Sequence, residues 1–201
     1  MQLLVATTNP GKVREFREML GRDGVAFSDL SAHQGTEAVE ETGHTFRINA
    51  CLKASYYAKL FDTWTVADDS GLAVDALGGA PGVHSARWAE MNRAGRGDSD
   101  NNALLLRQLE QVPDSRLAAR FDCVLALSDP NGNIVITARD TVEGRVIRAA
   151  RGTNGFGYDP LFFIDALGKT TAELAPDEKH AISHRGKALA HLRSLMTQLP
   201  L

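Results

Sequence analysis

The first half of the chain alternates short apolar runs with segments of helical periodicity. Leu3 to Ala6 is an unbroken apolar run, and three- and four-residue spacing of apolar residues follows it at Val13, Phe16 and Leu20. Such a run is typical of a strand that is covered on both faces, and such spacing is typical of a helix with one buried side. The start of the sequence therefore predicts a strand followed by a helix.

The same order returns between residues 45 and 71. A helical pattern runs from about Phe46 to Leu60, and Thr45 is placed to cap its first turn. Trp64 to Ala67 is a second apolar run, which predicts a buried strand that ends at the polar residues Asp68 to Gly71. Strands and helices that alternate in this way favour an α/β protein.

Paired strands are predicted in the middle of the chain. The β-rich segments Phe121 to Leu127 and Ile134 to Val142 are joined by Asp129 to Gly132, which has the composition of a hairpin turn. A polar loop from Arg93 to Asn102 and a helix from Leu104 to Leu109 are expected before them. A closing helix is predicted from the apolar face Leu189, Leu192, Met196 and Leu199. These patterns predict an α/β fold with a mixed sheet, in one domain over residues 1–201 because no linker interrupts the sequence.

Composition and charge narrow the classes of function. The 22 basic and 25 acidic side chains give a formal net charge of -3, which argues against a non-specific nucleic-acid binder but leaves a small anionic ligand open. Cys51 and Cys123 lie in apolar stretches without zinc-like spacing, which predicts reduced core residues. No apolar run approaches the roughly 20 residues that span a membrane, and Met1 to Val5 carries no basic leader. We therefore expect a cytoplasmic protein that does not bind membranes.

Thr7 to Lys12 forms the first candidate site, directly after the first predicted strand. Asn9 is a favourable N-cap, and Pro10 suits the first helical position. The free N–H groups at that helix start attract phosphate, and Lys12 adds a cation where the helix dipole alone would prefer an anion. A phosphate ligand would resolve this conflict, although a capped turn with a solvated lysine explains the pattern equally well. The glycine spacing of a Walker A loop is missing.

Asp68 and Asp69 form the second candidate site, at the carboxyl end of the second predicted strand, where ligands of open α/β sheets bind. Two adjacent carboxylates repel each other, and a divalent cation relieves the repulsion. Magnesium prefers oxygen ligands and is commonly held by one or two carboxylates together with substrate phosphates. The alternative is a polar turn in which an aspartate caps the next element.

A third acidic group, made of Glu37, Glu40 and Glu41, precedes the second helix, where carboxylates also favour the helix dipole alone. Asn49 and Lys53 lie one turn apart on that helix. The apolar neighbours of Lys53 predict an amine that emerges beside apolar surface. A lysine near an acidic metal site suits a ligand with the charge of a triphosphate.

Two later motifs predict a platform for a base. Gly152 to Pro160 contains three glycines together with Phe156 and Tyr158, whose rings could stack on a flat ligand. Ser183, His184 and Arg185 open the last helix and supply hydrogen-bond donors. A tight turn pinned by core aromatics and a solvated His-Arg pair are the structural alternatives.

The combination of these sites resembles the inosine/xanthosine triphosphate pyrophosphatase family, which removes non-standard purines from the nucleotide pool. The resemblance covers nearly the whole chain, and its motifs are Thr7-x-Asn9-x-x-Lys12, Glu40-Glu41-Thr42-Gly43, Ala67-Asp68-Asp69-Ser70-Gly71-Leu72, Gly78-Gly79-Ala80-Pro81-Gly82, Phe156-Gly157-Tyr158-Asp159-Pro160 and Ser183-His184-Arg185. It implies a magnesium-dependent hydrolase with an elongated mixed sheet whose two lobes flank an active-site cleft, usually in a homodimer. Thr8 stands where many family members have glycine, and Ala89 to Asp100 matches no motif that we can assign.

The resemblance also implies a role for each candidate residue. Asp69 would be a metal ligand and the base that activates water, and Lys53 would take part in catalysis. Glu40 would be a second metal ligand, with Glu41 and Asp68 as further candidates. The triphosphate would bind at Lys53, Thr7, Thr8, Asn9, Pro10, Gly11 and Lys12, and Ser70 would touch the substrate. The nucleoside would bind at Phe156, Gly157, Tyr158, Asp159, Lys179, His184 and Arg185.

The implied reaction is attack of water on the α-phosphorus of inosine, deoxyinosine or xanthosine triphosphate, which releases pyrophosphate and a nucleoside monophosphate. Donors from His184 or Arg185 would accept a 6-oxo purine and leave the amino group of adenine unpaired. A pyrophosphatase of modified pyrimidine or methylated guanine nucleotides is an alternative. A non-catalytic nucleotide sensor is another, although it would not need Asp68, Asp69 and Glu40 together.

Overall fold

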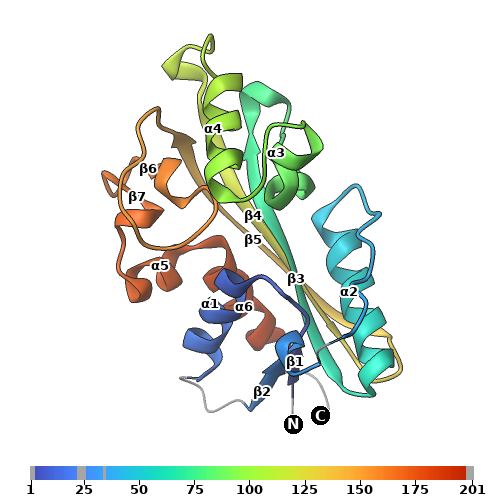
Figure 1. Cartoon of the computed structure of the whole chain (residues 1–201). Helices are drawn as coiled ribbons and strands as arrows, with labels where there is room; N and C mark the ends of the chain where they lie inside the picture. The colour runs from blue at the N-terminus through green and yellow to red at the C-terminus, as the bar shows by residue number, and fades with distance from the viewer. Residues whose placement is uncertain (1–2, 22–25, 34, 198–201) are drawn as a thin grey trace. The chain divides into compact units, whose positions relative to one another are not determined.

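The computed structural model describes residues 3–21, 26–33 and 35–197 (Figure 1). Within them, the strands are β1 (Leu3–Val5), β2 (Phe27–Asp29), β3 (Trp64–Val74), β4 (Ala118–Ser128), β5 (Ile134–Val146), β6 (Phe162–Ile164) and β7 (Lys169–Thr170). The helices are α1 (Pro10–Gly21), α2 (Phe46–Phe61), α3 (Trp88–Met91), α4 (Asp98–Gln108), α5 (Pro176–Ile182) and α6 (His184–Met196). The predicted α/β class with a mixed sheet is confirmed, since parallel and antiparallel pairs both occur in the strand order β2-β1-β3-β4-β5-β6-β7.

The chain divides into two compact units, each built from non-contiguous segments. The first unit comprises residues 1–69, 123–140 and 185–201, and the second comprises 70–122 and 141–184. The long strands β3, β4 and β5 contribute residues to both units, which explains why no linker in the sequence marks the division.

In the first unit, alternation along the strands separates two apolar clusters. Leu3 and Val5 of β1 pack with α1 and α6, through residues such as Phe16 and Leu189. Leu4 and Ala6 belong instead to a cluster that includes Ala50, Ala54 and Tyr57 of α2. Successive side chains of a strand point to opposite faces, so α2 covers one face of this part of the sheet and α1 and α6 cover the other (Figure 1).

The second unit has a core of its own, to which β3, β4 and β5 contribute. Leu72 of β3, Phe121 of β4 and Val146 of β5 lie in one cluster with Leu105 and Leu109, which α4 and the residue after it contribute. Tyr158 and Phe162 belong to the same cluster, so the segment that leads into β6 is anchored in this core. The segment Gly152 to Pro160, called the aromatic turn from here on, is therefore held in place by packing in this core.

The predicted starts of most elements are confirmed. Thr45 caps α2 by accepting a hydrogen bond from the N–H of Ile48 at 3.2 Å, and the hairpin turn closes with Gly132 N–H donating to Asp129 O at 2.9 Å. The apolar face of α6 reaches Met196, while Leu199 and the first two residues of the chain lie outside the described residues.

Two predicted boundaries are wrong. β3 does not end at Asp68 but continues through Gly71 to Val74, because the carboxylates within it are satisfied by neighbouring cations and no turn is needed. The expected polar loop from Arg93 to Asn102 is helical from Asp98 onward, because its acidic residues stabilise a helix N-terminus. In the described part of the chain, no helix has the length and apolar character that crossing a bilayer requires.

Candidate functional site

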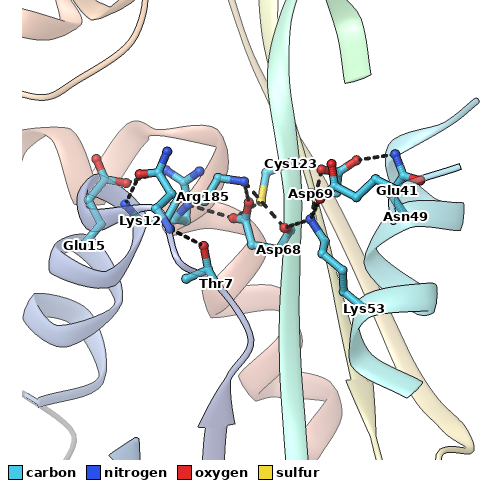
Figure 2. A network of polar contacts seen from close by, with 11 residues as sticks. Thr7, Lys12, Glu15, Glu41, Asn49, Lys53, Asp68, Asp69, Cys123 and Arg185 are labelled. Atoms are coloured by element: carbon cyan, nitrogen blue, oxygen red, sulfur yellow. Dashed lines mark hydrogen bonds and ion pairs between the residues drawn. The ribbon is translucent and has the colours of Figure 1, made fainter. Parts of the chain in front are cut away.

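Asp68 and Asp69 are consecutive in β3, and their side chains project to opposite faces of the strand (Figure 2). The residues before them alternate in the same way, since Val66 packs with α1 and α6 and Ala67 packs with α2. Each carboxylate therefore meets its own set of side chains. β1 ends next to Val66, so both carboxylates lie just beyond the carboxyl end of that parallel neighbour, where ligands of α/β sheets bind.

Asp68 is the centre of a buried ion network on the side of α1 and α6. Lys12 Nζ lies 2.5 Å from its Oδ1 atom, and Arg185 Nε lies 2.8 Å from its Oδ2 atom. The thiol of Cys123 donates to the same Oδ2 at 3.3 Å. Arg185 also pairs through Nη1 with Glu15 Oε2 at 2.5 Å. The carboxylates of Asp68 and Glu15 and the cations of Lys12 and Arg185 thus form one cluster.

The charges of this cluster are fixed by mutual pairing. Burial alone would raise the pKa of Asp68, but Arg185 and Lys12 together outweigh it and hold this pKa well below its usual value of 3.8. Burial would lower the pKa of Arg185, but Asp68 and Glu15 raise it well above its usual value. A carboxylate so firmly ionised is a poor proton acceptor, so Asp68 is suited to hold cations and unsuited to act as a base.

Asp69 faces α2 and contacts residues one turn apart on that helix. Lys53 Nζ lies 3.2 Å from Asp69 Oδ1, and Asn49 Nδ2 donates to Asp69 Oδ2 at 3.2 Å. Lys53 also donates to the main-chain oxygen of Asp68 at 2.8 Å and pairs with Glu41 Oε1 at 2.6 Å. One ammonium group therefore joins β3 to the acidic segment that precedes α2.

The pKa of Asp69 shifts in the opposite direction from that of Asp68. Burial raises the pKa of Asp69 above 3.8, Lys53 and Lys12 only partly offset this rise, and the charge of Glu41 adds to it. Lys53 stays protonated, because Asp69 and Glu41 outweigh the effect of its burial and raise its pKa. A buried carboxylate with raised basicity beside a fixed cation is suited to accept a proton from water.

The donors around Lys53 fit a divalent cation that prefers oxygen. Glu41 and Asp69 turn their carboxylates to the same nitrogen, at 2.6 and 3.2 Å, so both lie within reach of one positive centre. Gly43 N–H donates to Asn49 Oδ1 at 2.8 Å and fixes the segment that carries Glu41. Among the described residues, no three His, Cys, Asp or Glu side chains form a metal-binding group, so water or phosphate oxygens would complete the coordination.

The two glutamates of the acidic motif differ in their surroundings. Glu41 is partly buried against Lys53, whereas Glu40 is exposed. The family resemblance implied Glu40 as the second ligand, and acids that precede a helix carry no periodic signal that distinguishes one from the next. By contact with the network, Glu41 is the better placed of the two, and the ligand role of either stays a prediction.

The predicted phosphate turn has the expected local geometry. Asn9 caps α1, since its Oδ1 atom accepts from the N–H of Lys12 at 3.0 Å, and Pro10 is the first helical residue. Thr7 and Gly11 are buried, whereas Thr8 is exposed. A hollow of about 320 Å³ beside the turn is lined by Thr7, Thr8 and Pro10, with Arg14 and Arg17 and the acidic Asp29 at its other walls.

Two residues expected to bind the base are buried in this structure. Arg185 is 1% exposed and has Nε and Nη1 on Asp68 and Glu15, as described above. His184 is 6% exposed, and its ring stacks on that of Phe121 with 4.8 Å between centroids. Polar residues at a helix start are usually solvated, so the sequence could not reveal either position. Their contact with a base stays a prediction.

In the second unit, Asp159 organises the turn that carries Phe156. Asp159 Oδ2 accepts from the N–H of Phe156 at 2.8 Å and pairs with Lys179 Nζ at 2.6 Å, while Thr171 donates to Oδ1 at 2.8 Å. Lys179 Nζ also lies 5.2 Å from the centre of the Phe156 ring, which is half-buried. Asp159 and Lys179 are both buried and hold the turn in place, and their contact with substrate stays a prediction.

Tyr158 corrects the prediction of a second stacking ring. Its side chain is 3% exposed in the core of the second unit, and its hydroxyl donates to the main-chain oxygen of Ser85 at 2.9 Å. Ser85 Oγ in turn accepts from Leu72 N–H at 2.9 Å. A Cβ atom at Gly71 would come within 2.3 Å of that hydroxyl, which explains the glycine after Ser70. Ser70 itself is half-buried, and its contact with substrate stays a prediction.

Sequence reasoning missed two members of the ion network. Glu15 lies three residues after Lys12 in α1, so the two side chains lie on the same side of the helix, and this spacing from a candidate site residue was an available signal. Cys123 was predicted as an inert core residue. It is buried in the core and its thiol points at Asp68, a contact that no local pattern encodes.

Comparisons with known proteins show which family the chain resembles over its length. The model of the Ham1 family matches residues 3–195. The "dITP/XTP pyrophosphatase" of Exiguobacterium sibiricum is 50% identical over 98% of this chain and 98% of its own length, and that of Bacillus subtilis is 45% identical over 97% and 96%. A solved HAM1 protein from Coxiella burnetii has a TM-score of 0.86 at 38% identity, covering 99% of this chain and all of its own. The chain belongs to the Ham1 family.

Proposed function

We propose that the protein hydrolyses non-standard purine nucleoside triphosphates, those of inosine, deoxyinosine and xanthosine, to the monophosphate and pyrophosphate. The observation that carries the proposal is the pair of opposed sites on β3, a cation-holding Asp68 and a basic Asp69 beside Lys53. The relatives named dITP/XTP pyrophosphatases support the substrate class. Removal of such nucleotides keeps them out of DNA and RNA.

Asp69 acts as the base in this account. A water that bridges its carboxylate and the α-phosphorus gives up its proton to Asp69 as the new P–O bond forms and the bond to the pyrophosphate breaks. The raised pKa of Asp69 makes it a better acceptor than an exposed aspartate. Asn49 and Lys53 hold the carboxylate from two sides and keep it aimed at the water.

Lys12 and Lys53 carry the positive charge that the phosphates need. Lys12 pairs with Asp68 at the start of α1, where the helix N-terminus also favours an anion, and Lys53 bridges Asp69 and Glu41. Magnesium, when bound, supplies additional charge to neutralise the leaving pyrophosphate and to lower the pKa of water. Asp69 and Glu41 are the residues best placed to hold it, and Glu40 is the ligand that the family resemblance adds.

Phe156 is the proposed stacking surface for the purine, and hydrogen-bond donors toward the 6-oxo group distinguish hypoxanthine and xanthine from adenine. Phe156 is half-buried, which leaves it available to a flat ligand. A homodimer is proposed on the family resemblance, and a cytoplasmic location is proposed because the two free cysteines suit a reducing compartment.

The test is incubation of the purified protein with inosine triphosphate and magnesium, followed by separation of the products. Inosine monophosphate and pyrophosphate are expected in equal amounts, with far slower turnover of adenosine triphosphate. Stepwise release of orthophosphate, or a diphosphate product, would show that another bond is cleaved. Equal rates for modified pyrimidine nucleotides would favour the alternative substrate class.

A further inference from the structure

The first turn of α4 holds one peptide segment of the aromatic turn from both sides. Asp98 Oδ2 accepts from the N–H of Gly157 at 2.7 Å, and Asn102 Nδ2 donates to the main-chain oxygen of Gly157 at 3.0 Å. Asp98 and Asn102 are four residues apart, so they lie on the same face of the helix. This helix begins inside the segment Ala89 to Asp100, to which the family motifs assigned no role.

The two hydrogen bonds act on a glycine, the residue type with the greatest backbone freedom. The N–H of Gly157 belongs to the peptide before its Cα atom, and the carbonyl belongs to the peptide after it. Fixing both peptides fixes φ and ψ of a residue that has no Cβ atom and lies in the left-handed region at φ +63°. Fixing φ and ψ of Gly157 costs conformational entropy. Without these two hydrogen bonds, contacts within the turn alone would have to offset that cost.

The hydrogen bonds from Asp98 and Asn102 to Gly157 together form a clamp, and the position of Phe156 depends on it. Its own N–H is held by Asp159 Oδ2 at 2.8 Å, and the peptide that follows it is held by Asp98. The Phe156 backbone is therefore fixed on one side by a carboxylate of the turn and on the other by a carboxylate of α4. These two anchors fix the backbone from which the Phe156 ring projects.

We propose that Asp98 and Asn102 are positioning residues that set the Phe156 platform for the purine base. The inference rests on the proposed function, in which Phe156 stacks on the base. Neither residue touches substrate in this account. Their contribution is to pre-order the surface that the base meets, so that binding does not have to order it.

The clamp has a signature that separates it from a general structural role. Ligands with a purine should bind more weakly when it is removed, whereas pyrophosphate, which has no base, should bind as before. The Michaelis constant for inosine triphosphate should rise while kcat changes little, because a loosened platform weakens binding of the base in ground state and transition state alike.

The experiment compares Asp98→Ala, Asp98→Asn and Asn102→Ala with the wild-type protein. For the two alanine variants we expect a rise of about fivefold to tenfold in the Michaelis constant for inosine triphosphate and in the dissociation constant of inosine monophosphate. Inhibition by pyrophosphate and the melting temperature should stay near wild type. Asp98→Asn should recover part of the loss, since it keeps an oxygen that can accept from Gly157.

Asp100→Ala is the matched control, because this carboxylate lies in the same helical turn but accepts from the N–H of Arg96 at 2.7 Å. It should leave binding of inosine monophosphate unchanged. An Asp98→Ala variant that binds the monophosphate like wild type, or that loses pyrophosphate binding by the same factor, would overturn the inference. Wild-type protein that binds the monophosphate without hydrolysing the triphosphate would remove the proposed reaction alone, and protein that does not bind it would remove both.

Discussion

Asp68 and Asp69 share a peptide bond and have pKa values displaced in opposite directions. Strand alternation turns the first toward Lys12 and Arg185 and the second toward Lys53 and Asn49. Two cations at salt-bridge distance outweigh the burial of Asp68, whereas burial dominates at Asp69 (Figure 2). Asp68 is therefore suited to stay ionised and hold cations, whereas Asp69 is suited to accept a proton.

Asp69→Asn should abolish turnover while leaving the fold intact. A loss of about 100-fold or more in kcat is expected, because the amide cannot accept the proton of water. At neutral pH the raised pKa makes ionised Asp69 unfavourable to folding, so the neutral variant should melt at or above the wild-type temperature. Near-normal activity would remove Asp69 from the mechanism.

Asp68→Asn should behave in the opposite way toward stability. Removal of this charge leaves the partly buried Lys12 and the buried Arg185 beside a neutral amide, and a loss of about 3–5 kcal/mol in the free energy of unfolding is expected. Denaturant unfolding of the two asparagine variants measures the contrast directly. Equal stabilities of Asp68→Asn and Asp69→Asn would mean that the ion network does not hold the fold.

The acid dependence of stability follows from the lowered pKa of Asp68. Its contribution is fully present above the unfolded-state value of 3.8 and is lost only as the pH falls through the lower value of the folded state. Stability measured from pH 7 downward should therefore show no loss from this group above about pH 4. A steep loss near pH 6 that Asp68→Asn abolishes would contradict the assigned direction.

The loss of activity at low pH should reflect protonation of Asp69. Because its pKa is raised, kcat/KM should fall as the pH drops toward a midpoint above 3.8. Lys53 lowers the pKa of Asp69, so Lys53→Gln should move the limb of the residual activity to higher pH. A limb that stays in place, or moves to lower pH, would show that another group titrates.

Arg185→Ala separates the role expected from the sequence from the role that its contacts indicate. Loss of its bonds to Asp68 and Glu15 should destabilise the protein by about 3–5 kcal/mol and lower activity on every nucleotide. If Arg185 also donates to the purine, efficiency on inosine triphosphate should fall by a further ~10- to 150-fold and selectivity over adenosine triphosphate should decline. Equal losses on both nucleotides would confine Arg185 to the ion network.

The elements and the motifs could be predicted from the sequence, because both depend on local patterns. Asn9 and Thr45 cap their helices as expected, and the apolar runs form β1 and β3. The sequence could not show which residues, far apart in the chain, form ion pairs in the folded protein. Arg185 lies 117 residues from Asp68 and 170 from Glu15, and only the folded chain turns an apparent surface residue into a buried one.

Two predictions based on turn composition were wrong for a related reason, which is that long-range contacts override local composition. Asp68 to Gly71 has the composition of a turn, yet the residues run within a strand because cations on both faces satisfy the carboxylates. Tyr158 looked like a partner of Phe156 in stacking, but the turn at Gly157 places the two rings in different surroundings. Composition identifies polar and aromatic residues, whereas long-range packing decides what they face.

Hydrolysis of inosine triphosphate in water enriched in oxygen-18 tests the central claim most directly, because the label marks the phosphorus that water attacks. With Asp69 directing water to the α-phosphorus, mass spectrometry should find one labelled oxygen in inosine monophosphate and none in pyrophosphate from a single turnover. Label in pyrophosphate, with an unlabelled monophosphate, would place the attack on the β-phosphorus and contradict the account.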